Sequence, residues 1–243
     1  MTDLHTHTQA SDGDLTIEDL LRRYTAQGIK LGASDHLFRG RLETHEGISE
    51  YLSELEKLSV YRGCEIDLGD ERLLSDSLEE RFQYRILSAH YVWLPDGSFY
   101  SFEPYFAYRG DGVGAYQNNV QKCSAKRVLD RLLAAYEIDL KRRRVDILGH
   151  CTASPFHEAL LDDPFLNAWE DALLELCETY CVALEINSLW KSPGLRMIRK
   201  AADRGIKLSC GSDCHHARQT ADLAYVTDMV RQAGLTAEQF FQP

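Results

Sequence analysis

The sequence predicts an α/β fold built on a parallel sheet, and two observations lead to this class. Strand-like and helix-like patterns alternate seven times along the 243 residues, as in proteins assembled from strand–helix–strand units. No stretch rich in Gly, Ser or Pro interrupts this alternation, so we expect one domain spanning residues 1–243. A closed barrel and an open, doubly wound sheet both satisfy these observations.

Each expected element follows from local periodicity. In the first helix, Ile17, Leu20 and Tyr24 recur at helical spacing, and Gly28 then ends the helix. Short apolar runs between such segments predict the strands. We expect strands at residues 1–5, 29–34, 60–66, 84–90, 145–150, 182–187 and 206–212. We expect helices at residues 16–27, 48–58, 73–82, 124–142, 164–180, 193–204 and 217–233.

One segment, residues 91–123, fits neither pattern. It holds nine aromatic side chains, and a loop of this length is either functional or disordered. The aromatic content predicts an ordered excursion that packs on the domain. Two roles are open for it: a lid that excludes water from the site, or packing that seals the side of the barrel.

The composition narrows the class of partner. With 38 acidic against 27 basic residues the net charge is −11, whereas proteins that bind nucleic acids tightly usually carry a basic surface. No apolar run is long enough to span a membrane, and the first residues lack the features of a signal peptide. The seven cysteines are odd in number and scattered, which is typical of reduced thiols in the cytoplasm. We therefore expect a cytoplasmic protein without a membrane partner or a stable nucleic-acid partner.

Side chains with metal-ligand chemistry gather at the ends of the expected strands. Six of the seven strands finish in a His or an acid, and in a parallel α/β barrel these ends meet at one face. Alternation along a strand sends residues i and i+2 to one side, so His5 and His7 can face one site, as can the D-x-H sequence at 213–215. A lone His is more often structural, but the joint occurrence favours a metal centre. The candidate ligands are His5, His7, Asp12, His36, Glu65, His90, His150, Asp213 and His215.

The ligand types indicate which ions to expect. Imidazoles and carboxylates without a set of thiolates suit zinc, manganese or iron better than calcium. Six His and three acids exceed the needs of one ion, so we expect two or three divalent ions and a bridging carboxylate. Three divalent ions would outweigh the charge of the three carboxylates, so this acidic chain can still attract a phosphate at one point.

The motifs that carry these ligands resemble those of the PHP (polymerase and histidinol phosphatase) superfamily. They are DLHTHTQASDG at 3–13, GIKLGASDH at 28–36, GCEID at 63–67, SAHY at 88–91, ILGHC at 147–151, LEINS at 184–188 and GSDCHH at 211–216. They run in the order of the family and span nearly the whole chain. The resemblance implies a distorted, TIM-like (β/α)7 barrel with its metal site at the C-terminal ends of the strands. SAHY, ILGHC and LEINS are most similar to the branch that contains histidinol phosphatases.

The resemblance also implies three metal ions and divides the ligands among them. The first ion would be held by His5, His7, Glu65 and Asp213. The second would share Glu65 as a bridge and be completed by His90 and His150. The third would be held by Asp12, His36 and His215. Every ligand position that the family expects is filled, whereas a non-catalytic member would be expected to have lost some.

These expectations lead to the hydrolysis of a phosphomonoester of a small metabolite, either histidinol phosphate or a similar phosphorylated compound. A hydroxide bridging two ions near Glu65 would attack phosphorus in line, and the ions would neutralise charge on the phosphoryl oxygens. The expected catalytic residues are Glu65, His7, Asp213 and His215. Alternative activities for the same cluster are a phosphoesterase or nuclease acting on nucleotides or nucleic-acid ends, and a C–N hydrolase. A non-enzymatic, metal-holding protein is a further alternative.

Basic residues in loops of the same face are candidates for contacts with the substrate. Arg39, Lys191 and Arg218 each follow an expected strand end closely. Each can pair with a phosphate or a carboxylate, and solvated surface charge is the competing interpretation. A further histidine, His157, follows no strand end and is expected on the surface.

Overall fold

Seven parallel strands form the centre of the computed structural model, and hydrogen bonds between the first and the last close them into a barrel. The order of the sheet is β1–β2–β3–β4–β7–β8–β9. The Leu4 N–H donates to the Cys210 carbonyl at 2.9 Å, and the Asp213 N–H donates to the His5 carbonyl at 2.8 Å. The last strand thus returns to the first, which confirms the predicted (β/α)7 barrel and excludes an open, doubly wound sheet.

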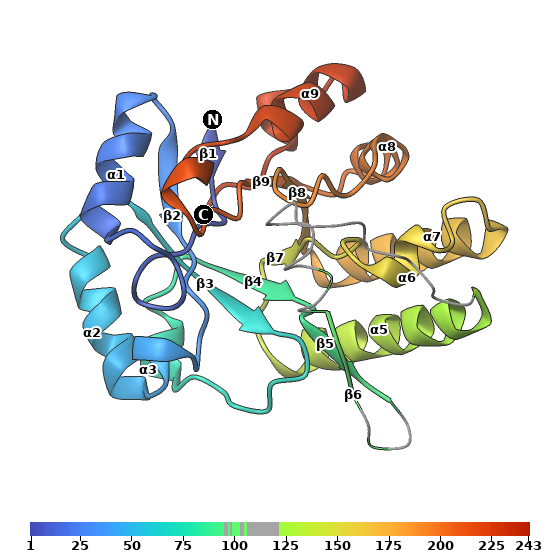
Figure 1. Cartoon of the computed structure of the whole chain (residues 1–243), viewed down its shortest axis with the longest axis horizontal. Coiled ribbons are helices and arrows are strands. Elements are labelled where there is room, and N and C mark those ends of the chain that lie inside the picture. The colour runs from blue at the N-terminus through green and yellow to red at the C-terminus, as the bar shows by residue number, and fades with distance from the viewer. Residues whose placement is uncertain (95–96, 98, 103–104, 106–121) are drawn as a thin grey trace.

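The structure describes residues 1–94, 97, 99–102, 105 and 122–243, and Figure 1 labels its elements. The barrel strands are β1 Thr2–Asp3, β2 Lys30–Ala33, β3 Tyr61–Asp67, β4 Tyr84–Ser88, β7 Ile147–Gly149, β8 Ala183–Asn187 and β9 Leu208–Gly211. The helices are α1 Ile17–Ala26, α2 His45–Leu55, α3 Asp76–Glu79, α5 Lys122–Arg142, α6 Pro155–Glu158, α7 Pro164–Tyr180, α8 Leu195–Asp203 and α9 Ala224–Ala233. Short 3₁₀ helices lie at Gly40–Leu42, Ala217–Gln219 and Ala237–Gln239.

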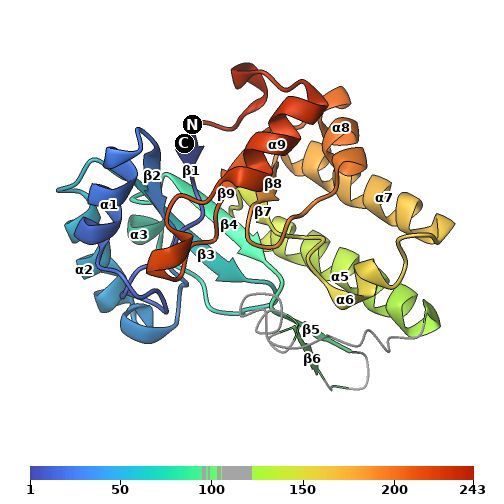
Figure 2. The same cartoon turned by 45° about the horizontal axis from the view of Figure 1, so that its top comes forward.

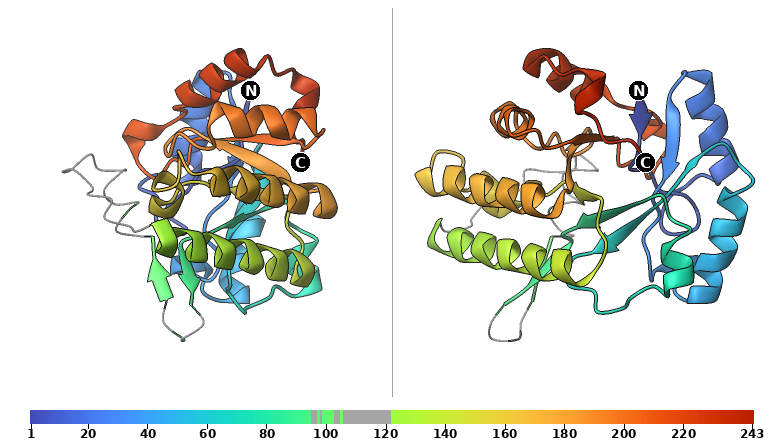
Figure 3. Two further views of the ribbon diagram at one scale, coloured as in Figure 1. Left: turned by 90° about the vertical axis from the view of Figure 1, so that its right-hand side faces the viewer. Right: turned by 180° about the vertical axis from the view of Figure 1, so that it is seen from behind.

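Helices cover the outside of the barrel. α1, α2 and α3 lie along one side in Figure 1, and α5, α7 and α8 are stacked along the other, as Figure 3 shows from behind. Turned forward in Figure 2, α9 lies beside α8. Among the described residues, no helix has both the length and the apolar character that a membrane crossing requires.

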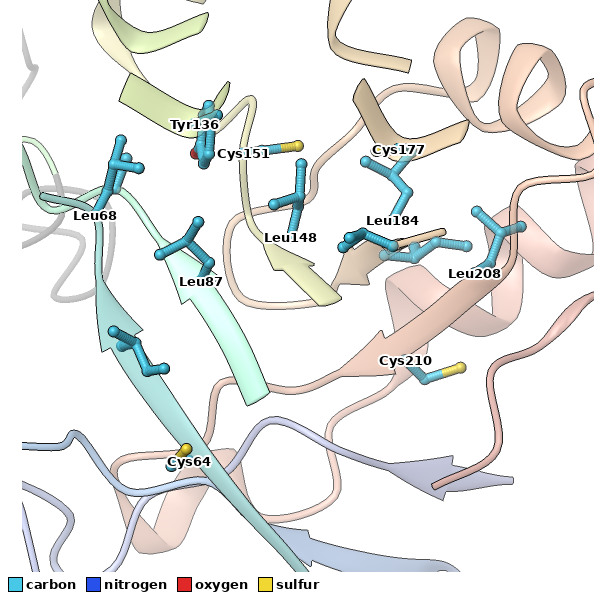
Figure 4. Packing of buried hydrophobic residues seen from close by; sticks show 14 of the residues in the cluster. Cys64, Leu68, Leu87, Tyr136, Leu148, Cys151, Cys177, Leu184, Leu208 and Cys210 are labelled. Atoms are coloured by element: carbon cyan, nitrogen blue, oxygen red, sulfur yellow. The ribbon is translucent and has the colours of Figure 1, made fainter. Parts of the chain in front are cut away.

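The main hydrophobic core sits between the strands and these helices. Leu87, Leu148 and Leu184 project outward from successive strands, where Tyr136 of α5 and Cys177 of α7 meet them (Figure 4). All five side chains are buried. The helical spacing of apolar residues in the sequence therefore comes from this outer layer, because each helix buries one apolar stripe against the sheet.

The inside of the barrel changes polarity along the strands. A second, small apolar cluster fills the lower part and consists of Leu4, Tyr84, Ile86, Ile147 and Ala183. One pleat further along β8, at residue 185, the inward position holds a buried glutamate instead of an apolar side chain. Strand alternation thus stacks a polar layer at the C-terminal mouth on an apolar layer below it.

Two predicted helices are wrong in extent. Residues 217–233 form a 3₁₀ turn and the separate helix α9, because Ala221 between them has a φ of +57° in the left-handed region, which a helix does not tolerate. Residues 73–82 contain only the single turn α3. Every barrel strand except β3 is also shorter than expected, so several candidate ligands lie just past a strand rather than within it.

The aromatic segment at 91–123 is partly described. Its first part is an antiparallel hairpin of β5 (Tyr91–Trp93) and β6 (Phe99–Ser101), which the sequence did not predict. The Phe102 ring is buried and lies 5.8 Å from the ring of Phe156. This contact agrees with the expected packing on the domain. The lid that the sequence allows falls largely on residues 103–104 and 106–121, which lie outside the described residues.

The barrel interior leaves no room at Gly63. A Cβ at this position would stand 2.1 Å from the buried ring of Tyr84, whose hydroxyl donates to the Leu4 carbonyl at 2.7 Å. We expect Gly63→Ala to lower the free energy of unfolding by about 1–3 kcal/mol, measured by urea denaturation, because the ring or the strand must shift. Gly194→Ser is the matched control, since a Cβ there meets no atom within 4 Å and serine suits this position at the start of α8. Equal losses in the two variants would contradict this account of the barrel interior.

Candidate metal centre

All nine predicted ligands come together at the C-terminal mouth of the barrel. Six of them are buried, namely His5, His7, His36, Glu65, His150 and Asp213. The side chains of His90, His215 and Asp12 are 13%, 23% and 45% exposed. The cluster is therefore open to solvent on the side of these last three residues.

The backbone bends sharply where two of these side chains enter the site. His150 directly follows β7 with a φ of +25°, and Asp213 follows β9 with a φ of +55°. Positive φ values are unfavourable for residues with a Cβ and are found where the surrounding structure enforces them, often at functional sites. Here the hydrogen bond from the Asp213 N–H to the His5 carbonyl holds one of the two bends.

Glu65, on β3, is the centre of the cluster. Its Oε1 lies 3.3 Å from the Nε2 atoms of His5 and His150. Its Oε2 lies 3.3 Å from His7 Nε2 and 3.1 Å from His36 Nδ1. The Nε2 atom of His90 is 3.6 Å from Oε1. One carboxylate thus faces five imidazoles, as a bridging ligand would.

Two further carboxylates complete the cluster. Asp12 lies 3.5 Å from each of three imidazoles, those of His7, His36 and His215. Asp213 Oδ1 lies 3.4 Å from His7 Nε2 and from His215 Nδ1. The ligand atoms fall into overlapping groups, of which Glu65/His90/His150 equals a predicted set and Asp12/His36/His215 is a predicted set joined by His7. The remaining predicted set is divided, because His5, His7 and Glu65 form one group while Asp213 groups with His5 and His150.

The spacing and the state of these atoms fit divalent metal ions. Two ligands at about 2.0–2.1 Å from one tetrahedral ion are about 3.3–3.4 Å apart, longer than a hydrogen bond and close to the distances found here. Buried atoms without a hydrogen-bond partner among the described residues include both nitrogens of His7 and both carboxylate oxygens of Glu65. Such atoms are costly unless something binds them, so the residues present fit the expected ions.

Two carboxylates behind the ligands orient them. Glu185 Oε1 accepts a hydrogen bond from His5 Nδ1 at 2.7 Å, and its Oε2 accepts the backbone N–H of His150 at 2.5 Å. Asp67 Oδ1 pairs with His90 Nδ1 at 2.6 Å. In each ring the Nε2 lone pair is thereby directed at Glu65, which is the usual way that proteins fix a metal-binding imidazole.

Other contacts fix the acidic ligands. The indole N–H of Trp190 donates to Asp213 Oδ2 at 2.5 Å, which leaves Oδ1 toward the imidazoles. Asp35 holds the loop that carries Asp12, because it accepts hydrogen bonds from the Thr8 N–H at 2.7 Å and the Ser11 hydroxyl at 2.7 Å.

Sequence reasoning missed the roles of Glu185, Asp67 and Trp190. The first two carry a signal that the i, i+2 rule contains: Glu65 and Asp67 alternate on β3 as His5 and His7 do after β1. The same rule places Glu185 inward on β8. Trp190 lies in an irregular loop, and no periodicity connects it to Asp213.

Attraction between the carboxylates and the imidazoles, together with burial, determines which groups of the cluster are charged. Burial alone would raise the pKa of Glu65, but His36, His5 and His90 hold it well below its ordinary value. Burial also opposes the charge of His215, yet its contact with Asp12 and the charge of Asp213 raise its pKa to about 9. For His36 burial dominates and lowers the pKa to about 3. Without metal, the site therefore combines ionised carboxylates with histidines of unequal charge.

The candidate substrate contacts have different environments. The half-buried guanidinium of Arg39 donates to Asp67 Oδ2 at 2.7 Å, so it sits directly behind His90. Lys191 is exposed and lines a cavity next to the cluster, and Arg218 is exposed on the 217–219 turn. The expectation for His157 was wrong: this residue is buried, and its Nε2 lies 3.3 Å from Glu170.

Comparison with known proteins agrees with this geometry. A family model for the PHP domain matches residues 3–189. The chain belongs to the PHP domain family. Membership confirms the predicted family and supports the predicted class of enzyme, a metal-dependent phosphoesterase.

The chain is also similar to a protein of known structure. The crystal structure of a "putative metal-dependent phosphoesterase" from Bifidobacterium adolescentis is similar at 16% identity, with 97% of each chain covered and a TM-score of 0.36. None of the curated proteins compared with the chain matches it.

The contacts of Glu185 predict a loss of metal affinity when its charge is removed. Glu185→Gln should weaken metal binding by about 10–100-fold, because an amide has one acceptor oxygen for the two donors, His5 and the His150 backbone, and carries no charge. Isothermal titration calorimetry of the metal-free protein with Zn²⁺ or Mn²⁺ measures this effect. Glu238→Gln, at an exposed position near the C-terminus, is the control. Unchanged affinity in Glu185→Gln would show that Glu185 does not orient the ligands.

The raised pKa of His215 predicts that metal binding releases protons. At pH 7 this imidazole is protonated in the metal-free protein, and a metal ion must displace that proton. Metal affinity should therefore rise with pH as His215 loses its proton around pH 9. Titrations in Hepes and Tris, which differ in ionisation enthalpy, count the protons released, and His215→Ala should release fewer. Identical heats in both buffers would contradict this prediction.

Proposed function

We propose that the protein hydrolyses a phosphomonoester of a small metabolite, using two or three divalent ions of zinc, manganese or iron. The observation that carries the proposal is the convergence of nine candidate ligands at one mouth of the barrel, among them Glu65, whose buried oxygens have no hydrogen bond among the described residues. Histidinol phosphate and similar phosphorylated compounds are the first candidates. The free thiols of the described cysteines suit the cytoplasm, which we include in the proposal.

The chain's own residues hold and shield the reacting centre. When bound, the ions supply an acidified water and neutralise charge that develops on the phosphoryl oxygens. Glu65, His7 and Asp213 hold them from the buried side. Asp12 and His215 lie at the exposed edge, where the phosphate has access. Arg39, kept in place by Asp67, offers its remaining N–H groups to a phosphate oxygen near His90.

A substrate screen tests the proposal. Protein loaded with Mn²⁺, Zn²⁺ or Fe²⁺ should release phosphate from at least one member of a set that contains histidinol phosphate, sugar phosphates and nucleotides. Glu65→Gln should lower kcat/KM by roughly a thousandfold, because the central bridging charge is lost, while circular dichroism stays unchanged.

Three outcomes would refute the proposal. Hydrolysis of labelled oligonucleotides or of C–N substrates, with no phosphomonoester turned over, would point to another hydrolase. If the fully metallated protein turned over none of the substrates tested, a metal-holding role would be indicated. Full activity of Glu65→Gln would show that the proposed centre does not take part in the reaction.

A further inference from the structure

A cavity of about 370 Å³ opens beside the metal centre and shares a wall with it. Its lining comes from Tyr105, from the loop after β7 with α6 and Leu161, from Glu170 of α7, and from residues 190–192 and 194–197, which follow β8. Trp190 is the shared wall: its ring lines the cavity and lies 6.3 Å from that of His150, while its N–H donates to Asp213. A substrate whose phosphate lies at the metal centre has this cavity as its neighbour.

The first turn of α8 presents hydrogen-bond donors to the cavity. Gly194, the N-cap residue, provides no side chain to accept from the first N–H groups of this nine-residue helix. Those groups, together with the helix dipole, favour an anion at this end. Leu195 and Arg196, which belong to this turn, also line the cavity.

A buried hydroxyl points independently to a ligand. Ser192 is only 6% exposed and lines the same cavity, and its Oγ has no hydrogen-bond partner among the described residues. A buried hydroxyl without a partner costs free energy that an external acceptor would offset. The neighbouring Lys191 adds an exposed ammonium group at the rim.

Arg196 is held in a fixed orientation by an ion pair with Glu170, which also lines the cavity. Its Nε and one terminal nitrogen donate to Glu170 Oε2 at 3.2 and 2.9 Å, which fixes the plane of the guanidinium. The second terminal nitrogen is left for another acceptor, and the side chain is 52% exposed. Glu170 is itself buried between Arg196 and His157, so its negative charge is matched within the protein.

The second carboxylate of the lining, Glu158, opposes an anion. Glu158 belongs to α6, not to the 191–197 segment, and it accepts a hydrogen bond from the Tyr105 hydroxyl at 2.9 Å. Against it stand Lys191, the Ser192 hydroxyl, the helix end and the N–H groups of Arg196 that do not contact Glu170. The donors gathered on one segment therefore favour an anionic ligand, with Trp190 and Met197 offering apolar surface beside it.

We propose that this cavity binds a second anionic group of the substrate, a carboxylate or a second phosphate, while the scissile phosphate lies at the metal centre. The inference rests on the proposed function and narrows it to phosphomonoesters that carry a distant anion. Lys191 and Ser192 are the specificity-determining residues, and the N–H groups of α8 are the anchor.

A matched series of substrates tests the inference. n-Alkyl phosphates, ω-carboxyalkyl phosphates, ω-aminoalkyl phosphates and α,ω-alkanediol bisphosphates are compared at equal chain length with the metal-loaded full-length protein. We expect KM to fall by about tenfold for the carboxylates or the bisphosphates over the n-alkyl compounds, at one preferred chain length. Whichever of the two gains more identifies the anion. A gain for the amines, or equal KM values throughout, would overturn the inference.

Variants locate the effect in the cavity. Lys191→Met and Ser192→Ala should each reduce the preference for the anionic substrates, and Gly194→Leu should abolish it, because its side chain would occupy the open space in front of the helix end. Lys57→Met, an exposed lysine next to α2, is the control and should keep the full preference. Retention of the preference in all three cavity variants would overturn the assignment to this cavity.

Direct binding separates this inference from the proposed function. ω-Carboxyalkyl phosphonates, which cannot be hydrolysed, are titrated calorimetrically into the metal-loaded protein and into Lys191→Met. Binding that depends on Lys191 supports the cavity even if no phosphomonoester is turned over, in which case only the proposed reaction fails. If n-alkyl phosphates are hydrolysed but the terminal carboxylate adds nothing to affinity, the reaction stands and the cavity inference fails.

Discussion

Both oxygens of the Glu65 carboxylate are buried at the mouth of the barrel and face imidazole nitrogens at 3.1–3.6 Å. A buried carboxylate without hydrogen bonds costs several kcal/mol unless positive charge compensates it. Much of the surrounding structure meets this requirement. Five imidazoles converge on one acid at distances that suit a shared ion. Glu185 and Asp67 hold two of those rings from behind, and the glycine at 211 leaves room, since a Cβ there would stand 1.9 Å from Glu185.

The alternation of side chains along the strands separates this charged cluster from an apolar layer deeper in the barrel. Inward positions on the parallel strands are apolar below the mouth, at Leu4, Ile86 and Ala183, and polar one pleat above. The apolar layer seals the base under the charged cluster, while the outward positions pack against helices. One fold thereby keeps an acidic, histidine-rich layer in a rigid and largely dry setting. Such a setting strengthens the electrostatic interactions that phosphoryl chemistry needs.

The two functional regions depend on each other through the loop after β8. Trp190 fixes Asp213 with its N–H and forms one wall of the neighbouring cavity with its ring. Residues 191–196 continue from it into the uncapped end of α8. Recognition of the distant part of a substrate and the geometry of an acidic ligand are thus set by one segment. A displacement of this loop would alter both.

The sequence by itself determined the parallel α/β class, the order of the elements and the set of nine candidate ligands, whereas the choice of a barrel came from the resemblance to the PHP superfamily. It could do so because apolar periodicity and the position of polar residues at strand ends are local properties of the chain. The i, i+2 rule also contained Asp67 and Glu185, although they were recognised only in the structure. The break before α9 and the hairpin at Tyr91–Ser101 were not predictable in this way, because backbone conformation and tertiary packing decide them.

Only the tertiary structure decided which atoms face one another. Closure of β9 onto β1 brings Asp213 next to His5, more than 200 residues away along the chain. The same folding turns Trp190 toward Asp213 and places Ser192 at a cavity, with a hydroxyl that has no hydrogen-bond partner in the described part of the chain. Sequence spacing specifies which side of its own strand a residue occupies. It does not specify distances between strands, because these depend on how the whole barrel closes.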